Sequence, residues 1–194
     1  MNHVPGWMSD VDLLEIDRLS SLLQPSDLVL EIGSFLGRSA VQWAVNLPNG
    51  RVVCVDPWVG NPKNYIDAYW IKRCDGDFSL VQLDQPTYKQ FLINTRHCPN
   101  ILPVRSKSED FEWYFDSPPS LIFIDGDHSY DGVIKDLDHS LLKWNATANT
   151  ILCGHDYNLE PVKMAVRNFS ICHGYDVSCA KDSTIWIIHK KQLT

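Results

Sequence analysis

The segment LIFIDGDHSYDGVIKDL, residues 121 to 137, places three carboxylates and an imidazole directly after a run of four apolar residues. In an open α/β sheet, ligands bind beyond the carboxyl ends of the strands, and Asp125 is the first polar residue past such an end. Imidazole titrates near neutral pH, so His128 is a candidate general base, with a cap on the following helix as the alternative role. Asp127 and Asp131 are assigned to the turn and to the helix start, where acids complement the helix dipole.

A second group of residues that could do chemistry surrounds the segment LEIGSFLGRS. Gly33 and Gly37 lie where an apolar strand turns into a helix, so the backbone there can bend tightly and approach a ligand. Asp56, about twenty positions further on, ends the next strand and is placed to accept hydrogen bonds from a ribose. Glu31 is a carboxylate inside an apolar strand, which is costly to bury without a partner. The alternatives are a tight turn, an exposed turn aspartate and a structural salt bridge.

Alternating strands and helices must position these residues, because short apolar runs alternate with segments of helical period. The predicted strands are 28–33, 51–56, 100–105, 120–125, 150–156, 175–180 and 183–189. The first five are apolar on both faces, as parallel strands covered by helices should be. The last two are joined by a short turn and predict an antiparallel hairpin. The segment from Ser9 to Leu23 predicts an amphipathic helix capped by Ser9, and 159–174 predicts a helix that ends at Gly174.

The stretch 57–83 does not follow this alternation. It is long and rich in aromatic residues, and it leaves the edge that holds the candidate ribose ligand. We expect it to cover the cleft and to offer aromatic faces to a substrate. Packing of the same side chains onto the sheet is an equal alternative. The aromatic residues concerned are Trp58, Tyr65, Tyr69 and Trp70.

The segments LEIGSFLGRS, CVDPW, IFIDGDHSYDGVIKDL and ILCGHDY, in that order and spacing, resemble the class I S-adenosylmethionine-dependent methyltransferases. Within that class the chain is similar to the small group of macrolide-sugar and rhamnose O-methyltransferases and cephalosporin-tailoring enzymes. The resemblance covers roughly residues 26 to 190. It implies a Rossmann-like α/β fold, a seven-stranded mixed sheet of order 3-2-1-4-5-7-6 with helices on both faces.

The resemblance also assigns cofactor residues. It implies that the methionine portion of S-adenosylmethionine lies over Glu31, Gly33, Ser34, Phe35, Gly37 and Ser39, the ribose on Asp56, and the adenine near Ser106, Lys107 and Ser108, with Asp125 also at the cofactor site. Relatives usually have Gly-Asp-Ser at 106–108, so an adenine contact here falls to a backbone N–H or to Ser108.

Asp156 ends the fifth predicted strand as Asp125 ends the fourth. If these strands are neighbours, as the resemblance implies, the two carboxylates could bind a divalent cation such as Mg²⁺. His155 and Tyr157 flank Asp156 where metal-using relatives offer a further oxygen ligand, so metal dependence stays open. Three roles stay open for His155: a second base, a residue that orients a carboxylate, and a residue that only fills the turn. With the resemblance, His128 and Asp125 are predicted to activate a substrate hydroxyl.

Composition narrows the function classes. The 194 residues are 44% hydrophobic, which predicts one domain over 1–194, led by a helix within 1–25. The formal net charge of -7 and the lack of a long basic run disfavour nucleic acid as a partner. No zinc-knuckle spacing links the six cysteines. The N-terminus lacks the pattern of a leader and no apolar run suits a membrane span, so we expect a cytoplasmic enzyme.

The predicted activity is methyl transfer to a hydroxyl, rather than to a nitrogen, of a small molecule such as a sugar or secondary metabolite, by a possible homodimer. An NAD-dependent oxidoreductase is the alternative of a different class, disfavoured because the G-x-G-x-x-G fingerprint is missing. A noncatalytic S-adenosylmethionine-binding module is the third.

Overall fold

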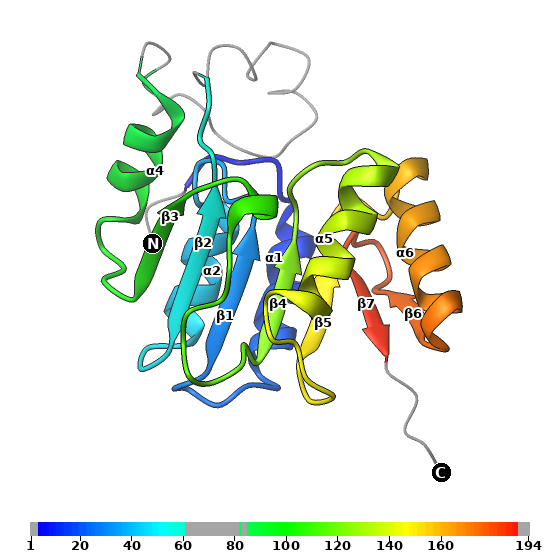
Figure 1. The fold of residues 1–194 in the computed structure, drawn as a ribbon. Coiled ribbons are helices and arrows are strands. Elements are labelled where there is room, and N and C mark those ends of the chain that lie inside the picture. The colour runs from blue at the N-terminus through cyan, green and yellow to red at the C-terminus, as the bar shows by residue number, and fades with distance from the viewer. Residues whose placement is uncertain (1–3, 61–81, 83–84, 190–194) are drawn as a thin grey trace.

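A computed structural model of the chain describes residues 4–60, 82 and 85–189. Its strands form one seven-stranded sheet of order β3-β2-β1-β4-β5-β7-β6 (Figure 1). The strands are β1 (Leu28–Ile32), β2 (Arg51–Asp56), β3 (Ile101–Arg105), β4 (Leu121–Ile124), β5 (Ile151–Gly154), β6 (Asp176–Cys179) and β7 (Trp186–His189). Neighbouring strands are parallel except where β7 runs antiparallel to β5 and β6. The order implied by the resemblance is confirmed.

Helices cover both faces of the sheet. One face carries α1 (Asp10–Ser20), α2 (Arg38–Asn46) and α4 (Thr87–Thr95), and the other carries α5 (Tyr130–Leu142) and α6 (Glu160–His173). In Figure 1, α5 and α6 lie in front of the sheet and α1 and α2 behind it. Successive strand residues point to opposite faces, so Val29 belongs to the first core and Leu30 to the second.

The helix ends follow the predicted signals. Ser9 caps α1 and accepts a hydrogen bond from the N–H of Asp12, whose carboxylate accepts one from the N–H of Ser9 in return. Gly174 ends α6 in the left-handed conformation, at φ 68°. The helix α1 ends at Ser20, three residues before the predicted end.

The C-terminal hairpin is also confirmed, although β7 begins at Trp186 rather than at residue 183. Ser183 and Thr184 instead donate hydrogen bonds to Asp12 on α1. The hydroxyl of Ser183 and the N–H of Thr184 are therefore bonded to the helix and not to a neighbouring strand. None of the helices in the described ranges has the length and apolar character that crossing a bilayer requires.

Candidate active site

A cavity of about 710 Å³ opens at the carboxyl ends of the central parallel strands. Its walls come from the loop after β1, the loop after β2, the acidic loop after β4, the end of β5 and the segment Gly6–Met8 that precedes α1. Among the predicted cofactor residues it is lined by Gly33, Ser34, Phe35, Ser39, Asp56, Lys107, Ser108 and Asp125. Glu31, Gly37 and Ser106 do not line it.

Positive φ angles shape the loop between β1 and α2. Gly33 has φ 84°, Phe35 42° and Gly37 91°, a region that L side chains rarely adopt. A Cβ atom on Gly33 would overlap the backbone carbonyl oxygen of Asp125. The absence of a side chain at Gly33 therefore lets the glycine loop touch the acidic loop that follows β4.

Asp56 ends β2 and holds this glycine loop from the side. Its Oδ2 accepts a hydrogen bond of 3.0 Å from the N–H of Phe35, and its Oδ1 accepts one of 2.6 Å from the N–H of Trp58. Burial raises the pKa of Asp56, against these backbone hydrogen bonds. Asp56 also lines the cavity.

Glu31 lies beneath the cavity, fully buried in β1. Ser39 donates a hydrogen bond to one of its oxygens, and the Cys54 thiol lies 3.6 Å from the other. In the described ranges no lysine, arginine or histidine forms an ion pair with Glu31, so the structural salt bridge considered above is absent there. Burial, above all, raises the pKa of Glu31 to about 8.

The two carboxylates at the strand ends do meet, because β4 and β5 are paired neighbours. Nε2 of His128 lies 3.0 Å from Oδ2 of Asp156 and 3.6 Å from Oδ1 of Asp125. One ligand atom of each of these three residues lies within 4.8 Å of the others. Asp156 takes φ 59°, which turns its backbone out of the strand direction. We call Asp125, His128 and Asp156 the acidic cluster.

Contacts within the acidic cluster shift the pKa values of its members. Contacts with the carboxylates of Asp125 and then of Asp156 raise the pKa of His128 to about 10, which favours the protonated ring at neutral pH. Burial raises the pKa of Asp156, but contacts with His128 and His155 outweigh burial and hold it well below its ordinary value.

The acidic loop also contains the residue that caps α5. Ser129, not His128, caps α5 and accepts a hydrogen bond from the N–H of Gly132. Asp127 accepts one from the N–H of Ser129 and closes the turn, as predicted, while Asp131 lies in the first turn of α5. His128 therefore has no capping role.

Trp58 lines the cavity, but most of its side chain packs into the interior. Its side chain is buried, its Nε1 donates to the carbonyl oxygen of Phe35 at 2.8 Å, and its ring packs against Tyr88 and Phe91. It supports the glycine loop from below. Tyr65, Tyr69 and Trp70, and with them most of the 57–83 segment, lie outside the described residues.

Comparison with known proteins decides the family. The model of a family described as "Methyltransferase domain" matches residues 30–157, which include the glycine loop, Asp56 and the acidic cluster. The chain belongs to the class I S-adenosylmethionine-dependent methyltransferases. This finding rules against the NAD-dependent oxidoreductase considered above. No curated protein sequence matches the methyltransferase.

Solved structures share the fold of the methyltransferase. A putative caffeoyl-CoA O-methyltransferase from Staphylococcus aureus is 16% identical, with a TM-score of 0.60, covering 97% of this chain and 86% of that one. The TDP-rhamnose 3'-O-methyltransferase CalS11 of calicheamicin biosynthesis is 12% identical, with a TM-score of 0.58, covering 93% and 79%. An rRNA methylase from Streptococcus thermophilus is 12% identical, with a TM-score of 0.55, covering 92% and 95%. The fold alone therefore leaves the acceptor of the methyltransferase open.

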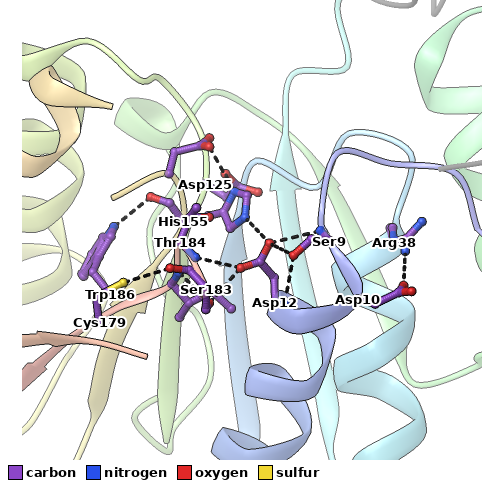
Figure 2. A network of polar contacts seen from close by, with 12 residues as sticks. Ser9, Asp10, Asp12, Arg38, Asp125, His155, Cys179, Ser183, Thr184 and Trp186 are labelled. Atoms are coloured by element: carbon purple, nitrogen blue, oxygen red, sulfur yellow. Dashed lines mark hydrogen bonds and ion pairs between the residues drawn. The ribbon is translucent and has the colours of Figure 1, made fainter. Parts of the chain in front are cut away.

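Two parts of the site of the methyltransferase were missed by sequence reasoning. Trp7, before α1, stacks on Phe35 with ring centroids 4.8 Å apart, and it lines the cavity. Asp12 reaches His155 at the end of β5 (Figure 2). Neither contact has a local signal, since each joins the N-terminal segment to a distant loop. The sequence predicted the cap at Ser9 but assigned no role to Asp12.

Proposed function

We propose that the protein transfers a methyl group from S-adenosylmethionine to a hydroxyl of a small molecule. The observation that carries the proposal is the contact between the glycine loop and the acidic loop at Gly33 and Asp125. A cofactor held by the first loop would present its methyl group beside a cluster of carboxylates and imidazole. These are the groups that orient and deprotonate an acceptor.

In this reaction the sulfur–methyl bond breaks as the oxygen–methyl bond forms, and the sulfonium becomes the thioether of S-adenosylhomocysteine. The hydroxyl proton must leave during or before that step. His128 and Asp125 are our candidates to receive and orient it, because both line the cavity next to the glycine loop. The methionine portion of the cofactor would lie along Gly33, Ser34, Phe35 and Ser39, with Gly37 shaping the turn and Glu31 supporting it through Ser39. The ribose would lie on Asp56, and the adenine near Lys107 and Ser108, with Ser106 behind them.

His128 can accept a proton only when its ring is neutral, and in this structure the two aspartates keep it protonated. A cation-binding role for the acidic cluster fits its chemistry, since two carboxylates and an imidazole converge within 4.8 Å. Asp125 and Asp156 would hold such an ion, with His128 beside it. A bound Mg²⁺ would supply positive charge to the two carboxylates and to the acceptor oxygen. With the carboxylates so neutralised, the pKa of His128 would fall toward its ordinary range.

A small acceptor is favoured over nucleic acid by the net charge of -7, which would repel a phosphate backbone. The solved O-methyltransferases named above support a hydroxyl acceptor on a sugar or phenol. The aromatic pair of Trp7 and Phe35 gives the cavity a flat apolar wall suited to such rings.

The first test is isothermal titration with S-adenosylmethionine, S-adenosylhomocysteine and NAD, with and without Mg²⁺, on the wild type, Asp56→Ala and the exposed control Asp116→Ala. We expect micromolar binding of the two adenosyl ligands that Asp56→Ala weakens at least tenfold and Asp116→Ala leaves unchanged. If neither adenosyl ligand binds the wild type, the proposal is wrong.

The second test separates an enzyme from a binding module. Formation of S-adenosylhomocysteine is measured with catechols, nucleotide-linked deoxysugars and their amine analogues as acceptors. We expect turnover on a hydroxyl compound that His128→Ala reduces at least a hundredfold while S-adenosylhomocysteine affinity is kept. His97→Ala, at an exposed histidine away from the cavity, is the matched control. Turnover only on amines would contradict the choice of oxygen.

A further inference from the structure

Asp12 is a buried carboxylate that gathers more partners than a helix cap requires. It is 3% exposed in the first turn of α1. Its Oδ2 accepts hydrogen bonds from the hydroxyl and the N–H of Ser9, at 2.6 and 3.1 Å. Its Oδ1 accepts from the hydroxyl of Ser183 at 2.8 Å and the N–H of Thr184 at 2.9 Å. Figure 2 shows Asp12 between the start of α1 and the loop that leads into β7.

The fifth contact of Asp12 is with His155, which links this carboxylate to the active site. Nε2 of His155 lies 3.2 Å from Oδ2 of Asp12. Nδ1 on the opposite side of the same ring lies 3.5 Å from Oδ1 of Asp125 and 3.4 Å from Oδ1 of Asp156. One imidazole therefore connects Asp12 with two members of the acidic cluster.

Backbone contacts leave ring rotation as the main freedom of His155. Its N–H donates to the carbonyl oxygen of Ile124 at 3.1 Å, and its carbonyl oxygen accepts from Nε1 of Trp186 at 3.0 Å. The side chain is 7% exposed. An imidazole presents two distinct nitrogens, and the partner of one decides what the other offers. Nε2 forms no hydrogen bond among the described residues, and its ion-pair partner is Asp12, whose charge favours the orientation in which Nδ1 faces Asp125 and Asp156.

We propose that Asp12 is a positioning residue for methyl transfer. It acts through His155 to hold Asp125 and Asp156 at the spacing at which both contact His128. This inference rests on the proposed function. The two aspartates would otherwise repel each other across a small volume. His155 and His128 contact the same two carboxylates, so a shift of the His155 ring changes the positions of the groups that His128 contacts. Replacing a residue that orients metal-binding or catalytic side chains typically lowers affinity or activity 10- to 100-fold.

The competing explanation is that Asp12 only stabilises the start of α1 and the β7 loop. Two variants separate the explanations. Asp12→Asn keeps the size of the side chain and an oxygen for Ser183 and Thr184, but removes the anion that faces His155. Ser9→Ala removes the hydroxyl that caps α1 and that also donates to Oδ2 of Asp12, but it keeps the anion that faces His155.

The experiment records the ring nitrogens of the seven histidines by long-range ¹H–¹⁵N NMR at one fixed pH. His128 and His155 are assigned with His128→Gln and His155→Gln. We expect Asp12→Asn to move the signals of both His155 and His128, and Ser9→Ala to move them by a smaller amount although it lowers the Tm. Affinity for S-adenosylhomocysteine should stay within threefold in both variants, because neither residue lines the cavity.

A milder variant covers the case in which Asp12→Asn does not fold. Ser183→Ala removes one donor to Asp12 and should shift the same two histidines by a smaller amount. Signals of His128 that remain at wild-type positions in every folded variant would overturn the proposal, as would equal shifts in Ser9→Ala. Failure of the wild type to bind S-adenosylhomocysteine would instead count against the proposed function. With an acceptor that the wild type methylates, Asp12→Asn should lower kcat 10- to 100-fold with KM within threefold.

Discussion

Glu31 places a carboxyl group in the interior of β1, where charge is costly. The hydroxyl of Ser39 and the thiol of Cys54 are its described partners, and neither is a cation. Burial therefore dominates and raises the pKa of Glu31 to about 8. At neutral pH most molecules carry Glu31 as the neutral acid.

This protonation state makes stability depend on pH. Between the unfolded pKa of about 4.3 and the folded value of about 8, the folded state binds the proton more tightly, so stability is present below that window and is lost as the pH rises through it. The shift corresponds to at most about 5 kcal/mol. We expect Glu31→Gln to remove this part of the slope in urea unfolding measured from pH 5 to 9.

The exposed Glu112 provides the control for this variant. Glu112→Gln should keep the wild-type slope, since its side chain lies in solvent. A slope in Glu31→Gln as steep as that of the wild type would mean that Glu31 is already ionised in the folded protein at neutral pH.

Single residues differ in how far their roles can be predicted from sequence. Asp56, Asp125 and Asp156 were found because each follows an apolar strand, and parallel strands bring their carboxyl ends together. Asp12 could not be found, because its hydrogen bond to Ser183 joins residues 171 positions apart and depends on where α1 packs. Trp7 was missed for the same reason.

At the scale of elements, the most demanding position is the turn between β1 and α2. Gly33 combines φ 84° with a backbone carbonyl where a Cβ would lie. We expect Gly33→Ala to separate the glycine loop from the acidic loop and to weaken S-adenosylhomocysteine binding at least tenfold, with a loss of stability of about 2–4 kcal/mol. Titration calorimetry and urea unfolding measure the two effects.

Gly174 is the matched control, because it has φ 68° but no atom within 4 Å of an added Cβ. Gly174→Ala carries only the conformational cost of a left-handed residue, about 1–2 kcal/mol, and should leave ligand binding unchanged. Similar binding by Gly33→Ala and the wild type would show that the close approach of the two loops is not needed to hold the cofactor.

The departures from the predicted elements also have local causes. The strand predicted over 150–156 ends at Gly154, because Asp156 turns to φ 59° and leaves the extended region. The strand predicted from 183 starts at Trp186, because Ser183 and Thr184 bond to Asp12. In both places, polar residues near the site form a turn or hydrogen bonds instead of continuing the strand. A pattern of apolar residues does not predict such contacts.

At the scale of the whole molecule, strand order was supplied by the family resemblance and not by the residue pattern. Apolar periodicity predicts which segments are strands, but parallel neighbours are joined by long crossovers, so several orders fit the same pattern. The helices then divide the interior into two cores, one on each face of the sheet. Each core contains a fully buried tryptophan, Trp43 on α2 in one and Trp144 after α5 in the other.

These two tryptophans differ in one property. Nε1 of Trp144 donates to the carbonyl oxygen of Phe111 at 3.1 Å, whereas Nε1 of Trp43 has no hydrogen-bond partner among the described residues. A buried N–H without a partner costs about 1–3 kcal/mol, and a satisfied one contributes about 1 kcal/mol. Phenylalanine removes the N–H and part of the ring in both cases, so the loss of apolar packing is similar.

We therefore expect Trp144→Phe to lower the free energy of unfolding more than Trp43→Phe does, by about 1–3 kcal/mol. Equilibrium urea unfolding followed by circular dichroism measures the difference, and equal slopes in the two variants would exclude a change in cooperativity. The comparison tests whether the sheet separates the two cores, because each variant alters one core and leaves the other intact. If Trp43→Phe were the more damaging, packing of its ring against Phe123, at 5.6 Å between centroids, would outweigh the unsatisfied N–H.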